Sequence, residues 1–187
     1  NKMPGIYEDK FANLKVGYTF MIGHPGKKLL FMGQDFGQFH EWDEKTALDW
    51  YLADEPLHKD LQKYYSDLLH IYRKYPALYR LDNDWNGFQW INANDGDRSI
   101  FSYIRRDETG KKSLLVVCNF TPMERADYRV GVPKRGTYTL VLDSTHGLYQ
   151  RGEKAPAFRS VKKECDGQPF SFAYPLPPYG AAIFRFS

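Results

Sequence analysis

The amino-acid sequence predicts an α/β segment followed by an antiparallel all-β domain. The first observation is a run of four apolar residues, 29–32, between two stretches in which apolar residues recur at helical spacing. Such a run is typical of a strand buried inside a parallel sheet. The second is that apolar and polar residues alternate from about Trp85 onward, as in antiparallel strands. The change of pattern predicts an α/β segment over residues 1–84 and an all-β domain over residues 85–187.

Two helices surround the buried strand of the first segment. Apolar residues recur at helical spacing over residues 9–23, and the sequence His24-Pro25-Gly26 ends this helix. A strand over residues 28–32 follows. A second helix is expected over residues 54–75, with Pro56 in its first turn. Helix, strand, loop and helix in this order form one slice of a β/α repeat.

A strand of this kind needs a neighbouring strand on each side, because its backbone groups must form hydrogen bonds. Residues 1–80 contain no second run that meets this need. The chain also begins with Asn1 rather than Met, and its first five residues show no periodicity. We therefore expect the segment to be the end of a barrel or open sheet whose other strands precede Asn1 in a longer protein.

Short strands separated by turn sequences make up the second segment. Residues 94–97, 107–110 and 133–136 each combine Gly with Asn, Asp or Pro, the residues that tight turns require. Seven or eight strands with such turns predict an antiparallel sandwich of about a hundred residues. The expected strands span residues 88–91, 99–104, 113–120, 128–132, 137–142, 170–176 and 181–186.

Composition and charge exclude several classes of protein. Hydrophobic residues make up 42% and aromatic residues 17% of the chain, which suits a globular core. The net charge of +3 is small and the basic residues are scattered among acidic ones, so we expect no nucleic-acid partner. The two cysteines, Cys118 and Cys165, fit a reducing cytoplasm, and no apolar run is long enough to span a membrane. The five histidines are dispersed without metal-ligand spacing, so we expect no metal site. No cofactor is expected either.

The loop that follows the predicted strand is the candidate site. Ligands of parallel α/β folds bind at the carboxyl ends of the strands, and this loop begins at such an end. It mixes polar and aromatic side chains, which predicts one wall of a cleft for a polar ligand with apolar faces, such as a sugar. The candidate substrate-binding residues are Gln34, Asp35, Phe36, His40, Glu41 and Trp42.

Several roles remain open for these residues. Asp35 and Glu41 fit a catalytic carboxylate pair, or else carboxylates that anchor the loop or cap a helix. Phe36 and Trp42 fit rings that stack on a glucose face, or rings that pack against the rim of a barrel. His40 is the one histidine placed in the expected cleft, where it would contact a sugar.

The chain closely resembles the C-terminal part of 1,4-α-glucan (glycogen) branching enzymes of the α-amylase superfamily. The resemblance covers nearly the whole chain. Its motifs are Lys2-Met3-Pro4-Gly5, Phe11-Ala12-Asn13-Leu14, residues 25–33, Glu41-Trp42, Leu48-Asp49-Trp50, Arg98-Ser99, Arg105-Arg106, residues 119–122, Asp127-Tyr128-Arg129 and residues 176–180.

This resemblance implies a (β/α)8 TIM barrel followed by a C-terminal β-sandwich, with residues 28–32 as the eighth barrel strand. It implies an enzyme that cleaves α-1,4 glucan with retention and transfers the oligoglucan to a C6 hydroxyl, forming α-1,6 branches. In the family, the Asp and Glu that perform this chemistry, together with a further Asp, precede the motif found here at residues 2–5. All of them would lie upstream of Asn1, so we expect no catalytic residue here and no branching activity from this chain alone.

Two alternatives remain open, of which the first shares the architecture and the second belongs to another class of protein. One is the C-terminal part of an α-amylase-type hydrolase, and the other is a non-catalytic glucan-binding or structural module. The sequence also departs from the family at one point, because family members often have Gly-Asn-Glu-Phe where this chain has Gly33-Gln34-Asp35-Phe36. The shorter carboxylate of Asp35 puts a family role for that residue in doubt.

Overall fold

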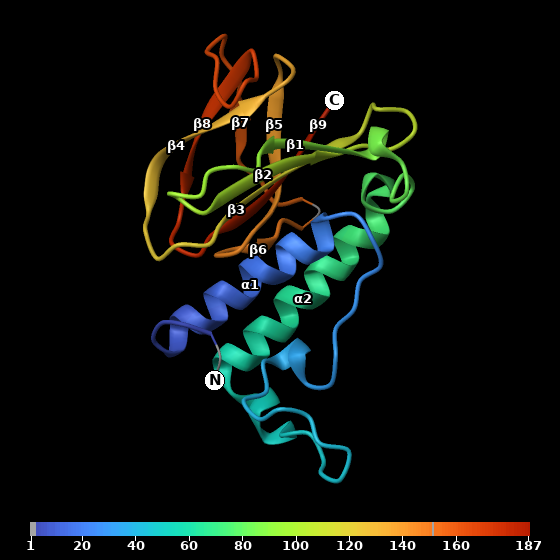
Figure 1. Ribbon diagram of the computed structural model, residues 1–187, viewed down its shortest axis with the longest axis vertical. Coiled ribbons are helices and arrows are strands. Elements are labelled where there is room, and N and C mark those ends of the chain that lie inside the picture. Colours follow the sequence, from blue (N-terminus) through green and yellow to red (C-terminus); the bar gives the residue numbers. More distant parts are fainter. Residues whose placement is uncertain (1–2, 151) are drawn as a thin grey trace.

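The computed structural model describes residues 3–150 and 152–187, so Lys2 of the first family motif lies outside it. Figure 1 shows two long helices beneath a set of twisted strands. Among the described residues, no helix combines the length and the apolar character needed to cross a bilayer.

Both predicted helices are confirmed. Helix α1 spans Tyr7–Gly23 and α2 spans Pro56–Lys74, with Pro56 at its first position. The two lie side by side (Figure 1) and share a buried apolar seam that includes Val16, Leu61 and Leu68. Four short 3-10 helices complete the helical segments: η1 (Gln34–Phe36), η2 (Trp50–Asp54), η3 (Pro76–Leu78) and η4 (Trp85–Gly87).

The strand predicted over residues 28–32 is not present in this structure. These residues are part of no helix or strand, and they connect α1 to η1 along the surface. Leu29, Phe31 and Met32 are 74%, 42% and 51% exposed. The physical reason is that no segment among the described residues pairs with the backbone here, so the apolar side chains have no sheet to enter.

The all-β prediction is confirmed. All seven expected strands are present, and the sequence missed β6 and β7 because two or three residues are too few to show a period. In the described residues the strands are β1 (Phe88–Asn92), β2 (Ile100–Arg105), β3 (Ser113–Asn119), β4 (Arg125–Val132), β5 (Thr137–Asp143), β6 (Gly147–Leu148), β7 (Ala157–Arg159), β8 (Phe170–Leu176) and β9 (Ala181–Phe186).

The strands form two antiparallel sheets. The described strands of the large sheet run in the order β1-β2-β3-β9-β5-β6, with β7 also paired to β5. The small sheet consists of β4 and β8. One face of the large sheet packs on the small sheet and the other packs on α1 and α2. The molecule therefore has three layers: helices, large sheet and small sheet.

Strand β3 is apolar without interruption from Leu114 to Cys118, its five central residues. All seven of its residues are buried. Val116 and its neighbours two residues away face the helices, whereas Leu115 and Val117 face the small sheet. Because successive side chains of a strand point to opposite faces, a central strand between two covering layers needs apolar residues at every position.

Arg105, at the end of β2, joins the helical layer to the large sheet. Its side chain is fully buried. Nη1 donates to the carbonyl of Gly23 at 2.7 Å, Nε donates to the carbonyl of Gly87 at 3.2 Å, and Nη2 pairs with Asp82 at 2.6 Å. The C-terminal end of α1, the segment after α2 and the large sheet therefore meet at one guanidinium.

Replacing Arg105 with Met should strongly destabilise the protein, because it leaves the Asp82 carboxylate and two carbonyls without their partner. Breaking a buried pair in this way costs about 3–5 kcal/mol of unfolding free energy. Urea unfolding followed by circular dichroism measures the change. The matched control is Arg185→Met on β9, an exposed arginine, which should change stability by less than about 0.5 kcal/mol. Equal losses in the two variants would contradict the assigned role.

Candidate functional site

The predicted site residues lie in one loop, residues 33–49, which we call the site loop. It follows the extended segment after α1 and leads into η2. Figure 1 shows it at the end of the two helices that points away from both sheets. The loop is therefore positioned by α1 and α2 rather than by the β-sandwich.

The first part of the site loop is a tight turn built around η1. Gly33 and Gly37 flank it with φ angles of 75° and 71°, in the left-handed region that favours glycine. The amide of Gln38 donates to the carbonyl of Gly33 at 3.0 Å and closes the turn. A Cβ on Gly37 would stand 3.0 Å from a methyl carbon of Leu61, so the turn also needs glycine to lie this close to α2.

Both helices hold this turn through side chains. The Tyr18 hydroxyl of α1 donates to the carbonyl of Gln34 at 2.5 Å. Burial, with a smaller contribution from the Asp35 charge, raises the pKa of Tyr18 well above its usual range, so the hydroxyl stays a donor. From α2, Nε2 of Gln62 donates to Oδ2 of Asp35 at 2.8 Å. The Asp35 carboxylate thus makes an anchoring contact with α2.

His58 of α2 is the most deeply buried of the groups that hold the turn. Its Nδ1 lies 2.6 Å from the carbonyl of Phe36, and its Nε2 lies 2.9 Å from the Tyr7 hydroxyl. A carbonyl only accepts, so Nδ1 carries a proton and donates; in the neutral ring Nε2 then accepts from Tyr7. The side chain is 0% exposed and packs edge-on against the rings of Phe11 and Phe39.

Phe36 anchors the turn from inside. Its side chain is 0% exposed, and its ring centre lies 5.4 Å from that of Trp50. A ring buried to this extent has no free face for a ligand. Of the two roles considered for Phe36, stacking on a sugar and packing within the protein, the buried ring fits packing.

The second part of the site loop closes on itself through polar contacts. His40 Nδ1 lies 2.7 Å from Oδ2 of Asp49, and the side chain of Gln38 bonds both the carbonyl of His40 and the amide of Asp49, at 3.1 and 2.9 Å. The His40 side chain remains 75% exposed. The histidine is thus held at one nitrogen by Asp49, while most of its surface faces solvent.

Exposed aromatic rings gather beside these polar groups. Trp42 packs edge-on against Phe31 with ring centres 5.2 Å apart, and it is 49% exposed. Trp50 and Tyr51, at the start of η2, are 59% and 67% exposed. Glu41 and Gln34 are also exposed. The loop therefore presents planar apolar faces next to hydrogen-bonding groups, the combination that suits a neutral polar ligand with apolar faces.

The sequence did not point to the residues that hold the turn, namely Tyr7, Tyr18, His58 and Gln62. One signal was present for His58, which lies next to Leu57 and three residues before Leu61 on the apolar stripe of α2. A histidine at such a position is buried and needs hydrogen-bond partners. Nothing local in the sequence identifies those partners, which lie 22 and 51 positions away.

Replacing His58 with Leu should loosen the turn, since it leaves the Phe36 carbonyl and the Tyr7 hydroxyl without their partner. We expect a loss of about 2–4 kcal/mol in unfolding free energy. We also expect faster amide hydrogen exchange at Gly37 and Gln38. The control is His70→Leu on the same helix, an exposed histidine whose Nδ1 lies 2.8 Å from the carbonyl of Ser66 in its own helix; exchange at the turn should not change in this variant. Unchanged exchange in His58→Leu would show that the turn does not depend on this residue.

Nearly the whole chain is similar to bacterial proteins named as glucan branching enzymes. Its most similar relatives include the 1,4-alpha-glucan branching enzyme GlgB of Butyrivibrio fibrisolvens, 55% identical over 187 residues that cover 99% of this chain and 29% of the relative. The protein of the same name from Aquifex aeolicus is 44% identical and covers 98% of this chain and 30% of the relative. The resemblance to branching enzymes is confirmed, and the chain spans about three tenths of the length of these relatives.

A solved structure with a similar fold is isomaltulose synthase from Klebsiella sp. LX3. It matches with a TM-score of 0.57 over 93% of this chain and 38% of the other, at 15% identity, so the likeness concerns the fold alone. The family described as "Alpha amylase, C-terminal all-beta domain" matches residues 90–187, which contain all nine strands of the described structure except the first two residues of β1. This chain therefore belongs to the alpha-amylase C-terminal all-beta domain family.

Proposed function

We propose that the chain is part of a 1,4-α-glucan branching enzyme of glycogen biosynthesis. Such an enzyme cleaves an α-1,4 glucan and transfers the oligoglucan to a C6 hydroxyl, which creates an α-1,6 branch. The observation that carries the proposal is the match to enzymes of this name over 98–99% of the chain, at up to 55% identity. A match confined to residues 90–187 would fit many members of the wider superfamily. This match includes α1, the site loop and α2 as well.

The catalytic carboxylates of the proposed enzyme belong to sequence outside this chain. Retaining glycoside chemistry needs two carboxyl groups about 5 Å apart across the scissile bond. Within the site loop, the carboxylate of Asp35 is engaged by Gln62. Because the resemblance to branching enzymes implies that the catalytic carboxylates precede the motif at residues 2–5, we assign no catalytic residue here and propose that the chain alone is inactive.

Residues 1–84 are proposed as the last β/α piece of a (β/α)8 barrel, and residues 85–187 as the β-sandwich domain that follows it. In the complete barrel, residues 28–32 would become the eighth strand, between two neighbours. The exposure of Leu29, Phe31 and Met32 supports this, because burying apolar area gains about 25 cal/mol for each Å². The remainder of the barrel is thus the proposed partner of this segment, in a cytoplasmic enzyme without nucleic-acid or membrane partners.

The site loop is proposed as one wall of the glucan-binding cleft. The α-glucan would contact Gln34, His40, Glu41 and Trp42, whose side chains are exposed. Asp35 and Phe36 would act by fixing the turn from which Gln34 projects. Trp42 offers the ring face for a glucose unit, and His40 offers a hydrogen-bonding group whose orientation Asp49 fixes.

Amylose stained with iodine should keep its absorbance after incubation with the purified 187-residue chain. Branching shortens the linear helices that bind iodine, and this chain would lack the carboxylates that break the glycosidic bond. The full-length relative from Aquifex aeolicus serves as the positive control. A fall in absorbance with the chain alone would mean that the catalytic groups were misplaced. Release of reducing sugar without branching would favour the hydrolase alternative.

Glycogen-affinity electrophoresis tests the site loop. The chain should be retarded by glycogen, and Trp42→Ala should weaken binding roughly fivefold, as expected for about 1 kcal/mol of ring stacking. The matched control is Trp85→Ala in η4, because Trp85 is 90% exposed and lies near the sheets rather than in the site loop. Equal weakening in both variants, or weakening in Trp85→Ala alone, would refute this assignment.

A further inference from the structure

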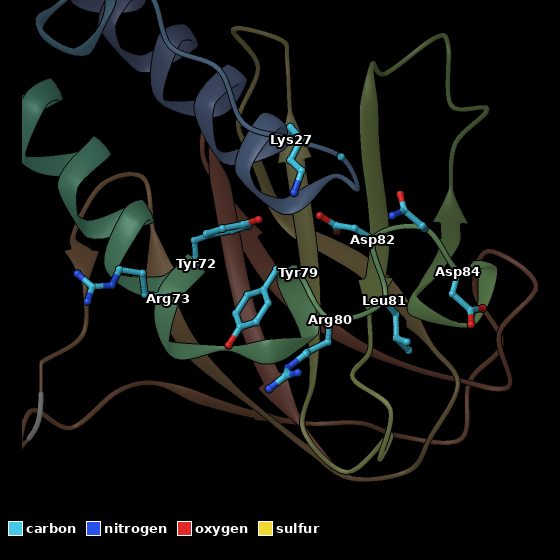
Figure 2. A pocket seen from close by; sticks show the side chains of 10 residues that line it. Lys27, Tyr72, Arg73, Tyr79, Arg80, Leu81, Asp82 and Asp84 are labelled. Carbon is cyan, nitrogen blue, oxygen red and sulfur yellow. The ribbon is translucent and has the colours of Figure 1, made fainter.

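A hollow lies at the opposite end of the two helices from the site loop. It is open to solvent, has a volume of about 660 Å³, and lies where the C-terminal end of α2, the turn after η3 and the loop after α1 come together. Figure 2 shows Lys27 reaching toward Tyr72 and Asp82, with Tyr79 and Arg80 on the far side of the hollow. Ligand sites commonly have volumes of about 300–1,000 Å³.

Three cationic side chains line this hollow without an anionic partner. Lys27 comes from the loop after α1, Arg73 from the last turn of α2, and Arg80 from the turn after η3. All three are exposed, and none forms an ion pair or a side-chain hydrogen bond within residues 3–150 and 152–187. Three chain segments thus contribute basic side chains to the lining of the hollow, although the Arg73 side chain points away from Lys27 and Arg80 (Figure 2).

The carboxylates of the hollow offset only part of this charge. Asp82 is paired with the buried Arg105 at 2.6 Å, so its charge is already balanced. Asp84 accepts a hydrogen bond from the amide of Asn86 at 2.8 Å, and its carboxylate offsets one of the cations of the lining. Lys28 adds a further cation beside the hollow, with its ammonium 5.6 Å from the centre of the Tyr72 ring. The balance at the hollow is therefore positive.

Two tyrosine rings form the apolar part of the lining. Tyr72 and Tyr79 have ring centres 5.7 Å apart with planes inclined at 54°. Tyr79 is exposed and Tyr72 is partly exposed, so ring surface is open to a ligand. Their hydroxyls, with the Asn83 amide, add hydrogen-bonding groups to the same wall.

We propose that this hollow binds a small phosphate ester that carries a ring, with the phosphoryl group held by the basic side chains of the lining and the ring against Tyr72 and Tyr79. Arginine binds phosphoryl oxygens through the several N–H donors of its planar guanidinium. Lysine binds them through the compact charge of its ammonium group. Tyrosine binds the face of a sugar or base. The site is separate from the site loop, and the inference does not depend on branching activity.

Isothermal titration of the 187-residue chain with glucose 6-phosphate and with adenosine monophosphate tests the proposal. Inorganic phosphate and glucose are the comparison ligands, since each carries half of the recognised chemistry. We expect saturable binding of at least one ester, at least about tenfold tighter than binding of phosphate or glucose. The tighter of the two esters identifies the ring as sugar or base.

Substitutions of the basic residues of the hollow test whether they bind the phosphate ester. Lys27→Gln and Arg80→Gln should each weaken ester binding about tenfold, as for loss of one charge-assisted contact. Lys162→Gln, an exposed lysine outside the hollow, should bind as the unchanged chain does. Because Lys27 and Arg80 are exposed, all three variants should keep the same melting temperature. The proposal is overturned if neither ester binds saturably, if inorganic phosphate binds as tightly as the esters, or if Lys27→Gln and Arg80→Gln leave binding unchanged.

Discussion

The buried guanidinium of Arg105 is the interaction on which the arrangement of the layers depends. From β2 it donates hydrogen bonds to the carbonyls of Gly23, at the end of α1, and Gly87, and it forms an ion pair with Asp82, so that it joins three parts of the chain. A cation removed from water is stable only when its donors are satisfied, so each of these segments must stay in place for the others to fold around it. Lysine would not replace it, because one ammonium cannot reach three acceptors that surround a planar fork. The end of α1 is fixed a second time by the Tyr103 hydroxyl, which donates to the carbonyl of Phe20 at 3.0 Å.

The three layers show that the two segments with different sequence patterns share one hydrophobic core. The period of the apolar residues changes near residue 84, yet one buried cluster includes Leu68 of α2, Val116 of β3 and Ile183 of β9. The helices therefore cover the large sheet much as the small sheet covers its other face. This packing also explains how the site loop keeps its position: it rests on α1 and α2, and these in turn rest on the sheet.

Much of the fold could be predicted because helices and strands follow from the spacing of apolar residues along the chain. The helical spacing located α1 and α2 to within two residues at each end, and the alternation in the second half located seven strands. Residues 28–32 were predicted as a strand from an apolar run alone, but strand pairing depends on neighbours that the run itself does not supply. Of the candidate site, the loop and its exposed residues could be predicted from the sequence, while the burial of Phe36 and the contact of Asp35 with Gln62 depend on packing against α2. Such contacts join positions far apart in the chain, and a single sequence carries no sign of them.

The segment between α1 and η1 has a consequence for how the chain behaves at high concentration. Leu29 projects into water from a stretch of extended backbone that belongs to no sheet. Such a stretch is a template for intermolecular β-pairing, which natural proteins usually suppress with charge, proline or a covering element. Lys27 and Lys28 stand at its start and repel a second copy. The colloidal stability of the chain is thereby tied to ionic strength, since added salt screens that repulsion and leaves the apolar attraction in place.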